Sequence, residues 1–169
     1  MELPKRKNTR LPGYDYSSEG AYFITICTQD KRCLLSRIVG DAALGIPENR
    51  LTKVGTIVEK YILSGRKMDV ITVDKYVIMP NHIHILLIVN GEKGGTPRAA
   101  SPTKAVVPRF VATFKRLVNK EIGQNIFQRS YHDHIIRNHK DYLRIWEYID
   151  NNPKQWELDC FYMRDLECI

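Results

Sequence analysis

The stretch that decides the fold lies between residues 76 and 89 and reads Tyr76-Val77-Ile78-Met79-Pro80-Asn81-His82-Ile83-His84-Ile85-Leu86-Leu87-Ile88-Val89. It predicts two apolar strands joined by a tight turn at the proline and the asparagine. Side chains alternate between the faces of a strand, so the two histidines share one face with Leu86 and Ile88. The alternate residues from Ile83 to Val89 fill the other face, as expected of a central strand that is covered on at least part of each side.

Two imidazoles at the start of such a strand require an explanation. A single histidine in a half-buried core is commonly satisfied by a hydrogen bond. A pair on one face, separated by one bulky apolar residue, also presents two neutral nitrogen ligands from a rigid support. His82 and His84 are therefore candidate metal ligands, and hydrogen-bonded core histidines are the alternative.

The overall composition restricts the class of protein. The chain has 169 residues, of which 43% are hydrophobic and 27% charged, as is typical of one globular domain. No apolar run approaches the roughly 20 residues that cross a membrane, and the start of the sequence lacks the apolar core of a secretory signal. We therefore expect a cytoplasmic protein without membrane contacts, whose cysteines are reduced.

The net charge points to an anionic partner. Lysine and arginine total 26 against 19 acidic residues, which gives a formal charge of +7. The basic residues are spread over several segments, and this distribution suits a nucleic-acid backbone better than one small ligand. Simple solubility is the alternative explanation of the charge.

The remaining pattern predicts an α+β fold. Strands are expected at residues 21–27, 70–79, 82–89 and 130–137. Helices are expected at residues 51–65, from about 107 onward, and at 139–151. Residues 28–50 are expected to be irregular, with a short hairpin near 34–39. The order β-α-β-β-α-β with a further helix is the ferredoxin-like or RRM-like arrangement, an antiparallel sheet with helices on one face and the other face free for a ligand. This topology puts His82 and His84 in mid-sheet.

The last predicted helix carries a second set of candidate functional residues. Tyr148 and Asn152 are four residues apart and share one helical face if the last turn holds. That face differs from the stripe expected to be buried, which comprises Tyr142, Ile145, Trp146 and Ile149. A half-buried packing tyrosine with a wet hydroxyl is the alternative reading of Tyr148.

A second histidine pair competes with the first. His132 and His134 also lie on one face of a predicted strand. The residue between them is the charged Asp133, and the pair lies near a strand end. We therefore expect it at the surface and rank it below His82 and His84 as a metal site.

Four segments together resemble one known family. They are residues 10–17 (RLPGYDYS), 22–28 (YFITICT), 76–87 (YVIMPNHIHILL) and 134–153 (HIIRNHKDYLRIWEYIDNNP). In this order they closely resemble the REP-associated tyrosine transposases, which belong to the single-tyrosine HUH transposases (histidine, hydrophobic, histidine). The resemblance covers most of residues 10–153. It implies an HUH transposase-like catalytic domain at 21–153, between a basic lead-in at 1–20 and a tail at 154–169.

The resemblance also implies an activity. His82 and His84 match the metal ligands of the family, Tyr148 matches its nucleophile, and Asn152 matches the polar residue that completes the metal site. The implied ion is Mg²⁺ or Mn²⁺. The implied activity is cleavage and strand transfer of single-stranded DNA at hairpins such as REP sequences, through a 5′-phosphotyrosine intermediate, in a bacterial, nucleoid-associated protein. We expect DNA contacts from Lys115, Arg116, Arg137, His134, Arg10 and Tyr14.

Two alternative functions and two questions stay open at this stage. The alternative from a different class is a domesticated protein that binds a DNA hairpin with weak or no catalysis. An RNA-binding ferredoxin-like module ranks last, because the expected aromatic pair on the sheet is replaced by two histidines. The sequence identifies no general base for the tyrosine and leaves open whether the protein is a monomer or a homodimer.

Overall fold

A four-stranded antiparallel sheet forms the centre of the protein. The computed structural model describes residues 11, 13–40, 47–65, 70–90 and 105–162. The sheet strands are β1 (Gly20–Cys27), β4 (Ile71–Ile78), β5 (His82–Val89) and β6 (His132–Ile136). They lie in the order β4-β5-β1-β6, and all neighbours are antiparallel. This is the expected ferredoxin-like topology, and β5, which carries both histidines, is a central strand as predicted.

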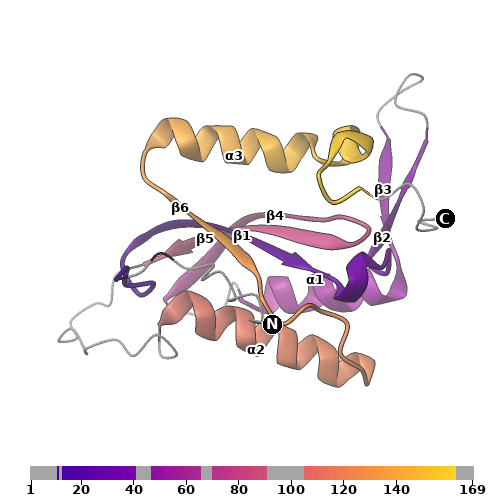
Figure 1. Ribbon diagram of the computed structural model, residues 1–169, viewed down its shortest axis with the longest axis horizontal. Coiled ribbons are helices and arrows are strands. Elements are labelled where there is room, and N and C mark those ends of the chain that lie inside the picture. The colour runs from indigo at the N-terminus through magenta and orange to yellow at the C-terminus, as the bar shows by residue number, and fades with distance from the viewer. Residues whose placement is uncertain (1–10, 12, 41–46, 66–69, 91–104, 163–169) are drawn as a thin grey trace, which may run out of the picture.

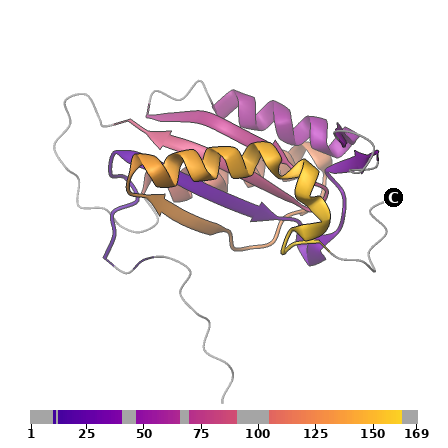
Figure 2. The same ribbon diagram turned by 90° about the horizontal axis from the view of Figure 1, so that it is seen from above.

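Three helices cover the two faces of this sheet. They are α1 (Lys53–Gly65), α2 (Val106–Ile122) and α3 (His139–Asn151). Figure 1 shows α1 and α2 on one side of the sheet and α3 on the other. Seen from above in Figure 2, α3 lies across the strands. No helix in the described ranges has the length and apolar character needed to span a bilayer.

The two faces of β5 belong to two separate cores. Ile83, Ile85, Leu87 and Val89 are fully buried in the larger core, beneath α1 and α2. On the opposite face Leu86 packs with Ile145 and Ile149 of α3. The predicted alternation of β5 is therefore confirmed. The expectation that this second face is free of helices is wrong, because the apolar stripe of α3 is buried against it.

One member of the expected α3 stripe is not buried. Trp146 is 39% exposed. The ammonium of Lys75, from the edge strand β4, lies over its indole ring and pairs with Asp150 at 2.7 Å. Because the helix crosses the edge of the sheet here, the tryptophan meets a lysine instead of an apolar residue, and the cation binds the ring face.

The segment expected to be irregular contains a small second sheet. After a short 3₁₀ helix η1 (Gln29–Lys31), β2 (Ser36–Val39) pairs with β3 (Glu48–Leu51), so the hairpin is longer than the one expected near 34–39. It is fixed to the main sheet because Ser36 and Asn49 both donate side-chain hydrogen bonds to the carbonyl of Ile78.

The cysteines differ in their redox state. The expectation of reduced cysteines is met by Cys27 and Cys160 and is wrong for Cys33, which is disulfide-bonded.

Candidate active site

The turn before β5 places the two histidines side by side. The amide of Met79 donates to the carbonyl of His82 at 2.8 Å and closes the turn, so the strand starts at the first histidine. Both imidazoles point to the α3 face and are 0% and 1% exposed. Their Nε2 atoms are 3.0 Å apart. Donor atoms that bind one ion at about 2.0–2.1 Å lie about 3.0–3.4 Å from each other, so this spacing fits a shared cation.

Hydrogen bonds at the other ring nitrogens orient the imidazoles. His82 Nδ1 lies 2.9 Å from Asn81 Oδ1, which can only accept, so this nitrogen carries the hydrogen and Nε2 keeps its lone pair. His84 Nδ1 lies 2.9 Å from the hydroxyl of Thr25, the residue opposite it on β1. Outer partners of this kind are typical of metal-binding histidines, because they fix the tautomer and the ring orientation.

Burial keeps both imidazoles neutral. The loss of hydration lowers the pKa of His82 to about 3, and the positive charge of Lys31 acts in the same direction. Burial also lowers the pKa of His84 well below its usual value, with a further contribution from His82. Neutral imidazole is the form that binds metal ions, so both side chains are in their ligand form at neutral pH.

Helix α3 brings Tyr148 to this pair. Its hydroxyl lies 3.3 Å from His84 Nε2 and donates to Asp159 Oδ2 at 3.2 Å. The residue is 38% exposed, so the phenol is reachable from one side. Burial of the hydroxyl is the main cause that raises its pKa above the ordinary value of a tyrosine, and the negative charge of Asp159 adds to it. The phenol is therefore protonated at neutral pH.

Asn152 lies one helical turn beyond Tyr148, as the sequence predicts. It is 2% exposed, and its Nδ2 donates to Asp159 Oδ2 at 3.0 Å. Its Oδ1 is buried and has no hydrogen-bond partner among the described residues. A buried carbonyl oxygen without a partner is costly, and a cation would satisfy it.

Asp159 belongs to the site and was missed by sequence reasoning. It follows the 3₁₀ helix η2 (Pro153–Leu158), and its side chain is 2% exposed. Its carboxylate and the Nε2 atoms of His82 and His84 provide three donor atoms within 4.8 Å of one another. No periodic pattern marks residues after Pro153, and the only signal was the apolar Trp156 and Phe161, which pack their rings against His82.

The donor set fits the divalent ion that the family resemblance implies. Two neutral imidazoles, a carboxylate and an unpaired amide oxygen converge from β5, the end of α3 and the segment after η2. Carboxylate and amide oxygens suit Mg²⁺ and Mn²⁺, and imidazole suits Mn²⁺ and Zn²⁺. Coordination to such an ion would use the two Nε2 atoms, which lie 3.0 Å apart in a buried site.

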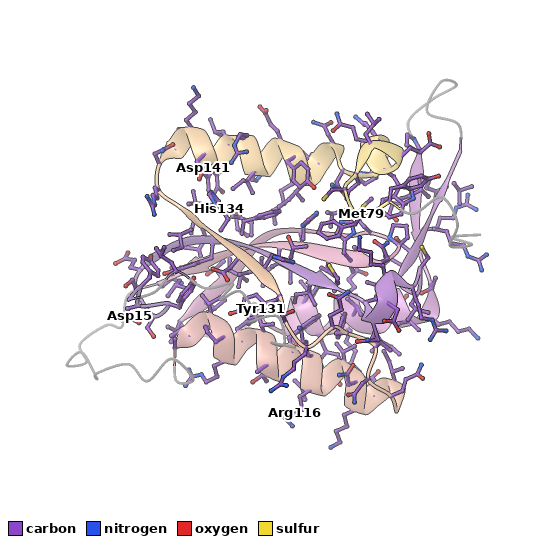
Figure 3. All side chains as sticks on the ribbon, viewed as in Figure 1. Asp15, Met79, Arg116, Tyr131, His134 and Asp141 are labelled. Atoms are coloured by element: carbon purple, nitrogen blue, oxygen red, sulfur yellow. The ribbon has the colours of Figure 1, made fainter. Side chains whose placement is uncertain are left out.

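The competing histidine pair is at the surface, as expected. His132 and His134 are exposed on β6, opposite Thr25 and Phe23, which places them on the same face as His84 but two strands away. His134 Nε2 lies 2.7 Å from Asp141 Oδ2. Figure 3 shows His134 and Asp141 where β6 meets the start of α3, at the opposite end of the helix from Met79.

The expected DNA contacts are dispersed over the molecule. Lys115 lies on α2, on the other side of the sheet, and its ammonium donates to the carbonyls of Gln128 at 2.8 Å and Ser130 at 2.9 Å. Burial lowers its pKa to about 8. Lys115 thus holds the loop before β6 and is not beside the histidines.

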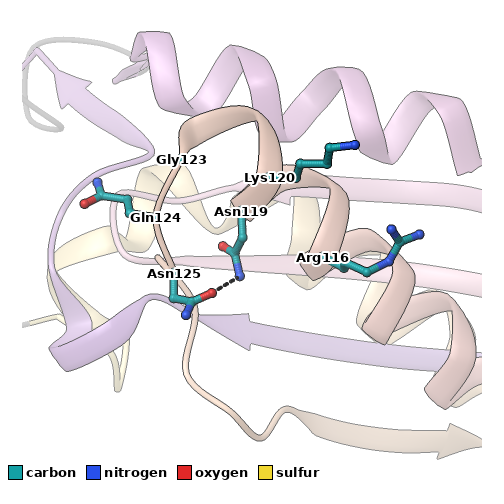
Figure 4. Close-up of a pocket in the computed structure, with 6 residues that line it drawn as sticks. All are labelled: Arg116, Asn119, Lys120, Gly123, Gln124 and Asn125. Carbon is teal, nitrogen blue, oxygen red and sulfur yellow. Dashed lines mark hydrogen bonds between the residues drawn. The ribbon is translucent and has the colours of Figure 1, made fainter.

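The other four candidates differ in their surroundings. Arg116 lines a surface pocket at the end of α2, together with Asn119, Lys120, Gly123, Gln124 and Asn125 (Figure 4). Arg137 is exposed directly after β6. Tyr14 packs edge-on against Tyr16 and lies 3.2 Å from the hydroxyl of Tyr22. Arg10 lies outside the described residues.

Comparisons with known proteins find relatives in sequence and in structure. No family model matches the chain. An uncharacterised protein of Haemophilus influenzae is 35% identical over 174 residues, covering 94% of this chain and 93% of its own. The solved structure of a REP-associated tyrosine transposase bound to a REP hairpin matches with a TM-score of 0.61 at 19% identity, covering 92% of this chain and 74% of the other.

Proposed function

This chain belongs to the family of the Haemophilus influenzae protein and has the fold of a REP-associated tyrosine transposase, and from this premise we propose a function. We propose that the protein cleaves and rejoins single-stranded DNA at hairpins such as REP sequences. The proposal rests on one observation above all. The hydroxyl of Tyr148 lies 3.3 Å from the Nε2 of His84, so a nucleophile adjoins a buried pair of metal-type ligands.

The reaction assigned to Tyr148 is a phosphoryl transfer. Its hydroxyl oxygen attacks the phosphorus of a phosphodiester, the bond from phosphorus to the 3′ oxygen breaks, and the leaving strand takes a proton to become a 3′-OH. The product is a 5′-phosphotyrosine. Since the new bond keeps the free energy of the diester, a 3′-OH of another strand can reverse the step, which makes strand transfer independent of an external energy source.

The surrounding residues prepare this attack. His82 and His84 would hold a divalent ion through Nε2, and Asn152 would do so through Oδ1. When bound, the ion would withdraw charge from a non-bridging phosphate oxygen and favour ionisation of the nearby phenol. Asp159 accepts the hydrogen bond from Tyr148 at 3.2 Å and so orients the hydroxyl within the site.

The burial of the site favours a second candidate function. Phe161 packs on the ring of His82 at 4.6 Å between centroids, and both imidazoles are at most 1% exposed. The segment therefore shields both imidazoles from solvent. Imidazoles shielded in this way are also compatible with a protein that binds DNA hairpins through its basic surface and does not cut them.

A labelled-DNA experiment separates the two functions. The protein is incubated with 5′- and 3′-labelled single-stranded hairpins and Mn²⁺ or Mg²⁺, beside the Tyr148→Phe variant. We expect a covalent protein–DNA adduct in the wild type, and its loss by at least about 1,000-fold in the variant, because phenylalanine has no nucleophile.

Tyr162→Phe is the matched control, since this tyrosine lies on the segment after η2 and packs on Trp156. It should retain the adduct. Hairpins that bind but give no adduct with either ion would establish the binding function instead. An adduct that persists in Tyr148→Phe would assign the nucleophile to another residue.

A further inference from the structure

The carboxylate of Asp159 lacks a cationic partner among the described residues. Its side chain is 2% exposed. Within the described ranges, the one basic nitrogen at ion-pair distance is His82 Nε2, at 3.9 Å. The other neighbours, Tyr148 and Asn152, donate hydrogen bonds to Oδ2. A buried carboxylate is costly unless it is paired or binds a metal ion, so this position favours a cation.

The carboxylate of Asp159 is held in place through both of its oxygens. Asn152 Nδ2 donates to Oδ2 at 3.0 Å, and the backbone amide of Phe161 donates to Oδ1 at 2.7 Å. Asn81 Nδ2 in turn donates to the carbonyl of Phe161 at 2.9 Å, which attaches the segment to the turn before β5. Metal-binding carboxylates are characteristically fixed by such outer hydrogen bonds.

A second observation at the same place also points to a cation. Asn152 Oδ1 is buried and unpartnered among the described residues, on the side chain whose Nδ2 contacts Asp159. Two imidazole nitrogens 3.0 Å apart complete the surroundings. All of these groups can offer a lone pair to a cation, and among the described residues no basic side chain other than His82 lies within ion-pair distance of Asp159.

From this geometry we propose that Asp159 is a protein ligand of the divalent ion, so that the metal site comprises His82, His84, Asn152 and a carboxylate from the segment after η2. This inference rests on the proposed function for the presence of the ion. It adds a ligand that lies outside the helix carrying Tyr148. It also implies that metal binding fixes residues 156–162 against the histidines, because one of the ligands belongs to that segment.

Metal binding without DNA tests the assignment. Mn²⁺ is titrated into the metal-free protein by calorimetry, and the melting temperature is recorded with and without the ion. We expect Asp159→Asn, which keeps the size of the side chain, to weaken Mn²⁺ binding by at least about tenfold and to remove most of the metal-induced rise in melting temperature. The control Asp150→Asn changes an exposed carboxylate paired with Lys75 and should bind Mn²⁺ like the wild type.

A measurement on the wild type keeps the assignment testable if Asp159→Asn does not fold. Amide hydrogen exchange in residues 156–162 should slow by at least about tenfold on addition of Mn²⁺, because a ligand in the segment couples its opening to release of the ion. Exchange that is unchanged when Mn²⁺ is bound would overturn the proposal.

The other outcomes separate this proposal from the proposed function. Mn²⁺ binding that survives intact in Asp159→Asn would overturn the ligand assignment and leave the cleavage reaction untouched. A wild type that binds neither Mn²⁺ nor Mg²⁺ would overturn both the ligand assignment and the metal dependence. A Tyr148→Phe variant that binds Mn²⁺ normally would show that the metal site is independent of the nucleophile.

Discussion

His82 and His84 show how single residues carry both stability and chemistry. Each imidazole is buried, and each uses Nδ1 for a local hydrogen bond, to Asn81 and Thr25 respectively. The Nε2 atoms are left to face each other at 3.0 Å. In the metal-free protein one Nε2 can donate a hydrogen bond to the other, and in a metal-bound protein both would donate their lone pairs to the shared cation, so the short separation suits both ligand binding and packing.

The depressed pKa values make stability depend on pH. In the unfolded chain both imidazoles have a pKa of about 6.5, so below that pH the unfolded state binds more protons than the folded state. The free energy of unfolding is therefore highest above about pH 6.5 and falls as the pH drops toward 3, the approximate pKa of His82 in the folded protein. For each histidine that stays neutral, the loss is about 1.4 kcal/mol per pH unit.

Urea denaturation of the metal-free protein at several pH values between about 7.5 and 5 measures this slope. Replacing His82 with glutamine should reduce the slope by about 1.4 kcal/mol per pH unit, because one of the two protonation differences is removed. The matched control is His139→Gln, at an exposed position at the start of α3, which should leave the slope unchanged. An equal slope in His82→Gln and the wild type would contradict the assignment of a neutral, buried His82.

At the scale of residues, the sequence supplied most of the candidate site. The spacing of His82 and His84 requires one shared strand face, and the spacing of Tyr148 and Asn152 requires one helical face, so both pairs could be predicted from local geometry. Asp159 could not. It lies after Pro153 in a 3₁₀ turn without a repeating pattern, and only the folding of that turn onto His82 brings its carboxylate into the site.

Helix α3 is the element that connects Tyr148, the proposed nucleophile, with the sheet. Asn138 caps its start, because its side chain accepts a hydrogen bond from the amide of Asp141 at 2.9 Å. Ile145 and Ile149 fix the helix on Leu86. The same helix ends at Asn152, so the position of its axis sets the place of both functional side chains.

Removing the cap should destabilise the protein by about 1 kcal/mol in Asn138→Ala, since one amide of the first turn loses its acceptor. Equilibrium denaturation measures the change. Lys140→Ala is the matched control, because it replaces an exposed residue of the same turn with a good helix former and should change stability by less than about 0.5 kcal/mol. A loss of stability in the control as large as in Asn138→Ala would show that the cap is not responsible.

At the scale of the whole molecule, we expect charge to set the strength of the proposed DNA binding. The formal charge of +7 is spread over the chain and is not gathered at the buried histidines. Most of the binding free energy for a DNA hairpin should therefore come from phosphate contacts on the surface, where bound counterions are released.

The affinity for a single-stranded DNA hairpin should fall by at least about tenfold between about 50 and 200 mM salt, as a plot of log affinity against log salt would show. Tyr148→Phe should keep the wild-type slope, because the phenol is not a phosphate-neutralising group. Arg116→Gln tests whether the pocket in Figure 4 contributes to DNA binding. If Arg116 contacts a phosphate, the slope of log affinity against log salt should be smaller by about one in this variant. Affinity that does not respond to salt would contradict a phosphate-dominated interface.

The sequence by itself determined the order of the elements, the face of β5 on which the histidines lie and the turn of α3 on which Tyr148 and Asn152 lie, because these follow from the periods of strands and helices. Only the tertiary structure decided that α3 crosses the second face of the sheet, that Trp146 meets Lys75, and that Asp159 completes the site. These are contacts between segments far apart in the chain. They depend on how buried surfaces fit together, and no local period records that fit.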